Sequence, residues 1–197
     1  MRQVLIMEEK SQKTLIALGS NEESVWGNAR VTVQKAMLRV SELAVSAPIC
    51  SMLYTTPAFP AGSGPAFVNA VMTFDAELSP HDMLAALHKI EAAAGRTRAT
   101  RWGQRTLDLD LIAMGAQVLP DAETFDMWRN LPLDAQTKQT PDTLILPHPR
   151  LQDRSFVLVP MVDVAPDWMH PVLGRTAREL CAALPTKDRA SVVPIVA

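Results

Sequence analysis

The stretch RWGQRTLDLDLIAM, which runs from Arg101 to Met114, determines how the rest of the chain is interpreted. Its second half alternates leucine with aspartate, the period of two that is typical of a β-strand with one buried face. Because successive side chains point to opposite faces, the leucines would face a core, while Asp108 and Asp110 would share the other face. The two residues would lie about 7 Å apart along the strand. The sequence therefore predicts two neighbouring carboxylates on the open face of a strand.

Two carboxylates at this spacing can hold one or two hard cations, and ligands that are all oxygen favour Mg²⁺. Four arginines precede them closely, namely Arg96, Arg98, Arg101 and Arg105. Acids that bind magnesium beside arginines that bind phosphate oxygens are the parts of a phosphoryl-transfer site. Taken separately, the aspartates could instead form a solvated strand face, and the arginines could form a basic surface loop.

The bulk composition is that of one globular domain. The chain has 197 residues, of which 48% are hydrophobic, enough for a substantial core. A formal net charge of −2 gives no global electrostatic reason to bind nucleic acid or an anionic membrane. Cys50 and Cys181 form no metal-spaced pair, and free thiols fit a reducing compartment. With no signal-peptide pattern and no apolar run near the roughly 20 residues that span a bilayer, we expect a soluble cytoplasmic protein and, as its simplest state, a monomer.

Apolar patterns and their breakers predict alternating strands and helices. In chain order these are a strand at 14–20, a helix whose apolar face runs from Trp26 to Leu43, a strand at 45–54, a loop at 55–66, a strand at 67–77, a helix from Ser79 to Gly95 and a strand at 106–114. This order of strand, helix, strand, strand, helix and strand is an α+β pattern. It predicts a ferredoxin-like two-layer sandwich, with a mainly antiparallel sheet and helices packed on it.

The chain as a whole would be one domain between two tails. The expected divisions are an N-terminal tail at 1–13, a domain at 14–185 and a C-terminal tail at 186–197. Further helices are expected at about 155–164 and 176–184. Residues 117–143 are polar and irregular, and they are too long for an ordinary connection, so they are interpreted as an insertion.

Other residues could contact a ligand. Phe67 and Asn69 share one face of their strand, so that a ring and an amide could hold a flat heterocycle; a core phenylalanine and a turn asparagine are the alternative. His148, held between two prolines, could reach a phosphate or serve as a structural cap. His88 and Glu91 lie three residues apart on a helix and would point together, either toward a ligand or as an exposed polar pair.

Six segments, in order, resemble the 6-hydroxymethyl-7,8-dihydropterin pyrophosphokinase family. They are IALGSN, YTTPAF, FVNAV, IEAAAGRTR, RWGQRTLDLDLI and LPHPRLQDRSFVLVP, and they span about residues 14–167. The resemblance implies a ferredoxin-like fold and an enzyme of folate biosynthesis. Such an enzyme moves a pyrophosphoryl group from ATP to the hydroxymethyl group of the pterin and releases AMP, with two Mg²⁺ ions. ATP and the reduced pterin would then be its small-molecule partners, with neither nucleic acid nor membrane.

The resemblance also assigns residues, position by position. Asp108 and Asp110 would bind the metal ions, and the catalytic set would add the arginines Arg96, Arg98 and Arg105. The pterin would stack between the rings of Phe67 and Phe156. Its further contacts would be Thr56, Ala58, Phe59, Asn69 and Arg154. ATP would be bound by His88, Glu91, Arg101, Trp102, Arg105, Ile112 and His148.

The chain departs from the family pattern at four places. His88 replaces a glutamine, Phe67 stands where a tyrosine is common, the basic loop is one residue short, and the segment 117–143 is longer than in compact members. We expect this insertion to pack on the ATP side with Phe125 and Trp128 as anchors; a mobile surface excursion is the alternative. Two other function classes stay open. One is a two-magnesium nuclease, which the lack of a basic surface disfavours, and the other is a non-catalytic ferredoxin-like ligand-binding module.

Overall fold

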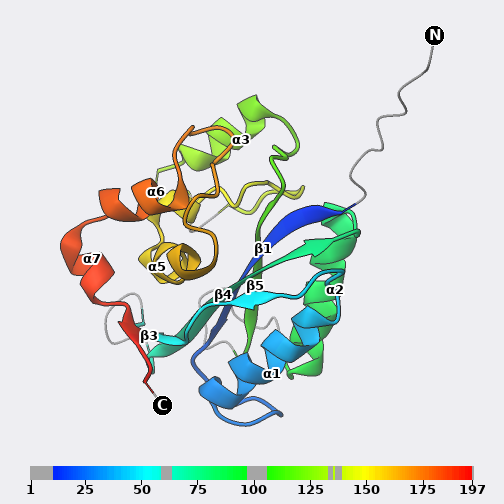
Figure 1. Cartoon of the computed structure of the whole chain (residues 1–197), viewed down its shortest axis with the longest axis vertical. Coiled ribbons are helices and arrows are strands. Elements are labelled where there is room, and N and C mark those ends of the chain that lie inside the picture. Colours follow the sequence, from blue (N-terminus) through cyan, green and yellow to red (C-terminus); the bar gives the residue numbers. More distant parts are fainter. Residues whose placement is uncertain (1–10, 59–63, 97–105, 133–134, 136–138, 197) are drawn as a thin grey trace.

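The computed structural model describes residues 11–58, 64–96, 106–132, 135 and 139–196, and it is built on a six-stranded antiparallel sheet (Figure 1). The strands are β1 (Gln12–Ser20), β2 (Ile49–Cys50), β3 (Tyr54–Thr56), β4 (Phe67–Ala76), β5 (Asp108–Met114) and β6 (Val193–Pro194). Their order is β5-β1-β4-β3-β6, and β2 also pairs with β4. The two longest strands, β1 and β4, therefore lie inside the sheet, where both of their faces can be covered.

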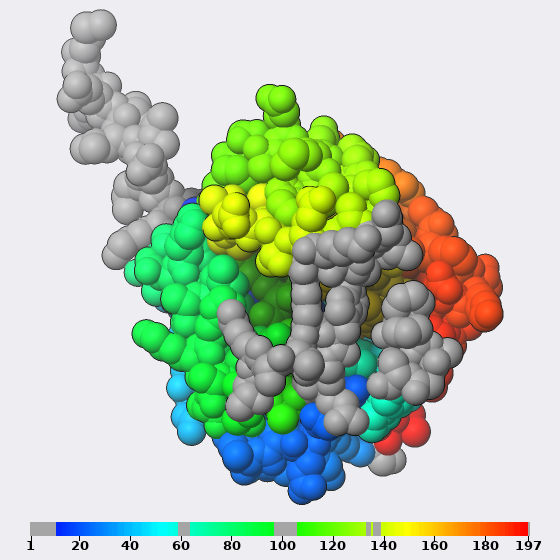
Figure 2. Space-filling model, turned by 180° about the vertical axis from the view of Figure 1, so that it is seen from behind, coloured from blue at the N-terminus to red at the C-terminus, as the bar shows by residue number. Residues whose placement is uncertain are grey.

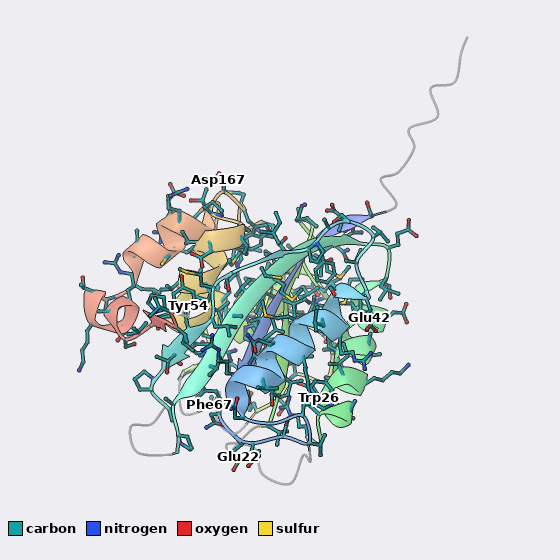
Figure 3. All side chains as sticks on the ribbon, turned by 60° about the horizontal axis from the view of Figure 1, so that its bottom comes forward. Glu22, Trp26, Glu42, Tyr54, Phe67 and Asp167 are labelled. Carbon is teal, nitrogen blue, oxygen red and sulfur yellow. The ribbon has the colours of Figure 1, made fainter. Side chains whose placement is uncertain are left out.

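Helices pack on both faces of this sheet, as Figures 1 and 3 show. The described helices are α1 (Ala29–Ser41), α2 (Pro80–Ala93), α3 (Ala122–Arg129), α5 (Ser155–Val164), α6 (Ala177–Ala183), α7 (Thr186–Ala190) and the short 3-10 helix η1 (Leu151–Asp153). α1 and α2 share a core with Ile16 and Met72, whereas α5 and α6 share a second core with Leu15 and Val71. Neighbours along one strand thus supply different cores, as alternating side chains require. None of the helices in the described ranges has the length and apolar character needed to cross a bilayer.

Local capping explains where the main helices begin. At the start of α2, the Ser79 side chain accepts a hydrogen bond from the backbone N–H of Asp82, and Pro80 occupies the first turn, where no N–H is needed. Asn28 caps α1 in the same way. Thr176 and Glu179 form a reciprocal capping box at the start of α6. These side chains fix the entry of each helix and hence its direction over the sheet.

A β-bulge interrupts the pairing of β5 with β1. Leu111 pairs with Ile16 and Ala113 pairs with Leu15, so Ile112 has no partner on β1. Ile112 and Ala113 both lie in the second core as a result, although they are neighbours in the chain. The carbonyl of Ile112 accepts a hydrogen bond from the backbone N–H of His148 at 2.8 Å. The bulge therefore provides an attachment point for the segment that carries His148.

The α+β class, with a mainly antiparallel sheet and helices packed on it, is confirmed. The layer of α5 and α6 on the second face is an addition to the expected two-layer sandwich. The strand expected at 45–54 divides into β2 and β3, because the Ser51 hydroxyl and N–H bond to the backbone of Val71 and interrupt the ladder.

Both segments that were expected to be tails contain regular structure among their described residues. β1 begins at Gln12, inside the expected N-terminal tail, and Lys13 pairs with Asp75 on β4 at 3.1 Å. The segment expected to be a C-terminal tail instead contains α7 and the two-residue strand β6, which pairs with β3. The insertion, expected to be irregular, contains α3. α7 and β6 are too short to leave a periodic pattern in the sequence, which is why they were not expected.

Candidate active site

One row of residues crosses four strands at the same level of the sheet. Tyr54 on β3 pairs with Asn69 on β4, Asn69 pairs with Gly19 on β1, and Gly19 pairs with Asp108 on β5. Residues that lie directly opposite each other on antiparallel strands project from the same face. By the same rule Asp110 lies opposite Ala17, a member of the second core. The two carboxylates therefore face the α5 side, as the LDLDL alternation predicts, while Leu109 lies in the larger core.

The glycine in this row makes room for its neighbour. A Cβ atom at Gly19 would lie 2.9 Å from Oδ1 of Asn69 and 4.0 Å from the ring of Phe67. Such an approach to a side-chain oxygen is shorter than real Cβ contacts, so the Asn69 amide can lie over Gly19 only because no side chain is present. Nδ2 of Asn69 donates to Oγ1 of Thr56 at 2.7 Å, which fixes the orientation of the amide. Thr56, Phe67 and Asn69, all expected in the pterin site, are thus brought together.

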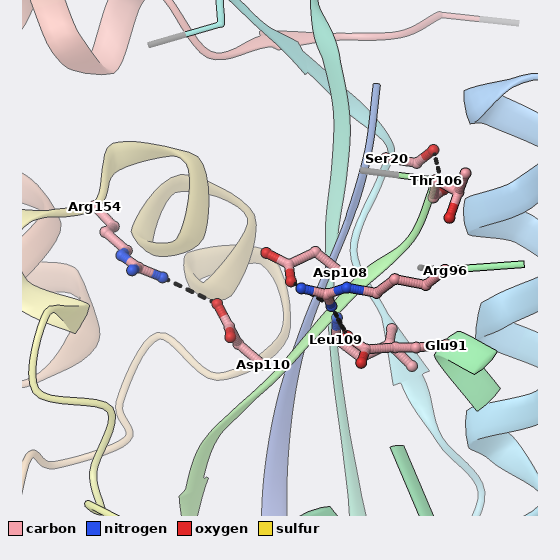
Figure 4. Close-up of polar contacts among 8 residues, drawn as sticks. All are labelled: Ser20, Glu91, Arg96, Thr106, Asp108, Leu109, Asp110 and Arg154. Atoms are coloured by element: carbon pink, nitrogen blue, oxygen red, sulfur yellow. Dashed lines mark hydrogen bonds and ion pairs between the residues drawn. The ribbon is translucent and has the colours of Figure 1, made fainter. Parts of the chain in front are cut away.

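Asp108 belongs to a cluster of charged groups between β5 and α2 (Figure 4). Its Oδ1 lies 2.7 Å from Nη1 of Arg96, and the same nitrogen also contacts Oε1 of Glu91. Glu91 is only 3% exposed, and its Oε1 accepts the backbone N–H of Leu109 at 2.8 Å. Burial raises the pKa of Glu91 to about 7, although the Leu109 N–H and the charge of Arg96 oppose the shift. This carboxyl is therefore poised to change its charge near neutral pH.

Asp110 is paired with the start of α5. Nη1 of Arg154 lies 2.9 Å from Oδ2 of Asp110 (Figure 4), and the Arg154 guanidinium stands 5.6 Å from the centre of the Phe156 ring. This distance is within the range of a cation–π contact. Phe156 itself is 38% exposed, a large fraction for an aromatic side chain, so part of its surface is open to a ligand. The N-terminal end of α5 therefore brings a ring and a cation beside the two aspartates.

His148 lies on the segment attached to the bulge. Its Nδ1 accepts a hydrogen bond from the backbone N–H of Arg150 at 3.1 Å. Burial, together with the positive charge of Arg154, holds the pKa of His148 well below its usual value. The ring is therefore neutral at pH 7 and carries its proton on Nε2, from which it can donate to an anion.

The inserted segment is attached to the same region. The backbones of Leu119 and Leu146 are joined by two hydrogen bonds, of 2.9 and 3.2 Å. The guanidinium of Arg150 donates to the carbonyls of Arg129 and Leu131, where α3 ends. Phe125 of α3 is fully buried, with its ring centre 5.6 Å from that of His170. Figure 2 shows a hollow on this side of the molecule, bordered by green atoms of α2 and yellow-green atoms of the insertion.

The remaining expected site residues fall into three groups. Ala58 is buried beyond the end of β3, and the side chain of Ile112 lies in the second core, so that only its backbone faces the His148 segment. His88 is exposed and Glu91 is buried, and that the two side chains point together toward a ligand stays a prediction. The rest lie outside the described residues, and they are Phe59, Arg98, Arg101, Trp102 and Arg105.

Three residues of this region were not expected from the sequence. They are Gly19, which lies under the Asn69 amide, Tyr54, which pairs with Asn69 across the sheet, and Arg150, which binds the end of α3. A glycine that ends an apolar strand is a signal for a close approach of other groups, and Gly19 could have been found in this way. Tyr54 and Arg150 act through tertiary contacts, which leave no local signal in the sequence.

Comparison with known proteins identifies the kind of molecule to which this arrangement belongs. A model of the family described as 7,8-dihydro-6-hydroxymethylpterin-pyrophosphokinase (HPPK) matches residues 15–166. The 2-amino-4-hydroxy-6-hydroxymethyldihydropteridine pyrophosphokinase of Pseudomonas aeruginosa is 37% identical over 175 residues, covering 88% of this chain and 93% of that protein. The protein of the same name from Synechocystis is 36% identical over 158 residues, covering 78% of this chain and 70% of its own length.

A solved structure supports the fold. The chain superposes on wild-type Plasmodium falciparum HPPK-DHPS with a TM-score of 0.61 at 16% identity, covering 89% of this chain and 45% of that one. At this identity the match shows a shared architecture, and the sequence matches carry the assignment of the family.

Proposed function

Because the chain belongs to the 7,8-dihydro-6-hydroxymethylpterin-pyrophosphokinase family, we propose that it transfers a pyrophosphoryl group from ATP to 6-hydroxymethyl-7,8-dihydropterin in folate synthesis. The hydroxymethyl oxygen attacks the β-phosphorus of ATP, the bond from that phosphorus to the oxygen of the α-phosphate breaks, and AMP leaves. The hydroxyl proton passes to solvent or to a phosphate oxygen. The products are AMP and the pterin diphosphate, in equal amounts.

The observation that best supports this proposal is the row from Asn69 through Gly19 to Asp108. Neighbouring strands lie about 5 Å apart, so Asn69 and Asp108 are separated by roughly 10 Å across the sheet. An amide that reads one edge of a flat heterocycle at Asn69 would leave the opposite substituent near the aspartates. Phe67 and Phe156 would supply the stacking faces, from β4 and α5.

Asp108 and Asp110 fit a magnesium site. Both side chains are partly exposed, both offer carboxylate oxygens, and both lie on the same face of β5. In the described part of the chain no group of three His, Cys, Asp or Glu side chains forms a more complete metal site. Mg²⁺ commonly takes one or two carboxylates and completes its shell with water and substrate phosphates. When bound, Mg²⁺ would offset the charge of the triphosphate.

The chain's own cations and hydrogen-bond donors would position the phosphates. Arg96 and Arg154 already lie against the two aspartates, and each could exchange that contact for a phosphate oxygen. The neutral His148 would donate from Nε2 without adding charge. The roles expected of Arg98, Arg101, Trp102 and Arg105 stay predictions, because these residues lie outside the described ranges. Catalysis would then rest on positioning and electrostatics rather than on a strong protein base.

The insertion at 117–143 would form a wall of the nucleotide side. Its attachment through Leu119 and through the contact of Arg150 with the end of α3 places it next to the His148 segment. Hydrogen exchange with and without a non-hydrolysable ATP analogue tests this. We expect slower exchange in α3 when the analogue is bound. Unchanged fast exchange throughout the insertion would favour a surface excursion.

Identification of the products tests the reaction. The protein is incubated with Mg²⁺, ATP and 6-hydroxymethyl-7,8-dihydropterin, and the nucleotides are separated by ion exchange. We expect AMP in an amount equal to the pterin diphosphate, and no AMP when either pterin or Mg²⁺ is omitted. ADP with a pterin monophosphate would indicate an ordinary kinase. Cleavage of nucleic acid without pterin would indicate a nuclease, and ligand binding without turnover would indicate a non-catalytic module.

A further inference from the structure

Tyr54 makes a contact that the proposed reaction does not use directly. It is 5% exposed, and its hydroxyl donates a hydrogen bond to Oδ2 of Asp163 at 2.8 Å. The same oxygen accepts the backbone N–H of Met52 at 3.4 Å. Burial and the carboxylate of Asp163 raise the pKa of Tyr54 to about 12, so the phenol is a permanent donor at any working pH. The segment that leads into β3 is thus attached at two points to one side chain of α5.

This contact fixes the second end of α5. At the first end, Arg154 is paired with Asp110 on β5. Asp163 lies in the last turn of the same helix. A helix of this length extends about 15 Å, so two contacts at its ends set its direction over the sheet as well as its distance from it. Phe156, the exposed ring expected to stack on the pterin, is carried between these two contacts.

On the sheet, the contact begins next to Asn69, the amide proposed to bind the edge of the pterin. Tyr54 pairs directly with Asn69 across the ladder of β3 and β4. Two residues further along β3, Thr56 accepts the hydrogen bond from the Asn69 amide. One short strand therefore both orients the amide and holds the helix that bears Phe156.

We propose that Tyr54 is a positioning residue for the pterin: through Asp163 it sets the spacing between Phe156 on α5 and the pair Phe67 and Asn69 on β4. This inference rests on the proposed function, because it assigns the spacing to a pterin. Tyr54 acts without touching the substrate. Loss of its hydroxyl would let α5 shift by a fraction of an ångström, which would weaken the binding of a heterocycle stacked on Phe156. ATP would be affected much less, because α5 would supply only Arg154 to its phosphates and the other contacts would come from other elements.

The test uses the substitution Tyr54→Phe, which keeps the ring and removes only the hydroxyl. Asp163 is exposed, so its carboxylate remains solvated and the fold should survive, with a melting temperature within a few degrees of the wild type. We expect KM for the pterin, and its dissociation constant by calorimetry, to rise at least fivefold, while KM for ATP stays within twofold. Asp163→Ala should give the same selective loss. The double variant should be no worse than the worse single variant, because both remove one contact.

Asp167→Ala is the matched control, because Asp167 is an exposed acid four residues away whose nearest cation is Arg178 at 3.8 Å. It should leave both KM values unchanged. Equal losses for ATP and pterin, or a fall in melting temperature with unchanged KM values, would mean that the contact is merely structural and would overturn the inference. A wild-type protein that binds no pterin would overturn the proposed function instead, so the two failures are distinguishable.

Discussion

At the scale of single residues, the site depends on groups that are held by the backbone of the sheet. Gly19 leaves space for the Asn69 amide, and the N–H of Leu109 binds the buried carboxyl of Glu91. Both contacts involve the backbone of the sheet, so strand register sets the positions of the Asn69 amide and of the N–H that binds Glu91. Substitutions at this scale should therefore change chemistry or ionisation more than folding.

Replacing Asp110 with asparagine should remove most of the activity. Asp110 lies on the open face of β5 rather than in the leucine core, so we expect the melting temperature to stay within a few degrees. Loss of one charge-stabilising contact typically raises a barrier by ~2.7–4 kcal/mol, equivalent to a hundredfold or greater loss of turnover. Pterin-dependent AMP formation measures it, with Asp188→Asn on the exposed surface of α7 as control. Retention of more than a tenth of wild-type turnover would exclude the metal assignment.

Glu91→Gln should change how stability depends on pH. The pKa of Glu91 is raised from 4.5 to about 7 in the folded protein. Between pH 4.5 and 7 the folded state therefore keeps a proton on Glu91 that the unfolded state has lost. The stability that this group contributes is complete below pH 4.5 and is lost as the pH rises through 7. Relative to the glutamine variant, the wild type should lose on the order of 3 kcal/mol at most across that window. Urea unfolding at pH 5, 6, 7 and 8 measures the difference, and a constant difference would contradict the assigned cause.

The sequence predicted some of these residues and could not predict others. Alternation placed Asp108 and Asp110 on one face without any knowledge of the fold, because strand geometry is local. Family resemblance supplied Thr56 and Phe156, which lie far apart in the chain. The contact between Tyr54 and Asp163 joins residues 109 positions apart, and only the packing of α5 on the sheet brings them together.

At the scale of elements, α5 connects the site to the second core. Its inner side chains Val157, Leu158 and Met161 are fully buried, while Phe156 is partly exposed. Pro160 lies inside the helix and has no N–H to donate to the carbonyl of Phe156, so that one helical hydrogen bond is missing one turn from the site. The helix is thus anchored by its apolar face and by its end contacts.

Phe156→Ala should weaken binding of the pterin far more than binding of ATP. Stacking of a base on an aromatic ring is worth about 1–3 kcal/mol, and a pterin offers a similar flat surface. Because the ring is 38% exposed, its removal should cost little stability. Calorimetric titration with each ligand measures the effect. Phe125→Ala is the contrasting variant: that ring is fully buried, and its loss should lower stability by roughly 3–5 kcal/mol. Equal losses of affinity for both ligands in Phe156→Ala would contradict a stacking role for Phe156.

Elements were predictable from the sequence where they are long. The helix at 155–164 and the strand at the LDLDL segment were found where expected, because an apolar run or an alternation marks them. β2, β3 and β6 are too short for any period, and each forms because β4 or β3 offers an open edge. Prediction therefore failed where an element depends on its neighbour.

At the scale of the whole molecule, two regions carry buried ionisable groups with opposite responses to acid. Glu91 is one of the buried residues of α2, the helix that packs on the larger core. His170 is fully buried where α3 meets the segment before α6, with its ring 5.6 Å from Phe125 and 5.5 Å from Trp168. Its Nδ1 accepts two backbone N–H groups, whereas Nε2 has no hydrogen-bond partner among the described residues. Protonation of this ring would put an unpaired charge into an aromatic cluster.

His170→Asn should make the protein less sensitive to acid. Burial, aided by the charge of Arg129, lowers the pKa of His170 from 6.5 to about 4. The stability linked to this group is complete above pH 6.5 and is lost as the pH falls through 4. Asparagine keeps an acceptor for the backbone N–H groups but does not titrate. Between pH 6.5 and 4, the wild type should lose stability relative to His170→Asn, the reverse of its trend relative to Glu91→Gln. If the stability of the wild type relative to each variant changed with pH in the same direction, the opposite responses assigned to His170 and Glu91 would be contradicted.

The bulge at Ile112 also has a consequence for how this chain can change in length. Ile112 has no partner on β1, and regular pairing resumes on both sides of it. Its deletion would cost one buried side chain and the carbonyl that accepts the His148 N–H, but it would leave Leu111 opposite Ile16 and Ala113 opposite Leu15. Deletion of Leu109 would instead slide the ladder by one step and turn an aspartate toward the leucine core. Of the two positions, only Ile112 should allow the loss of a codon without a change of strand register, so a change of length in β5 should disturb the sheet least at the bulge.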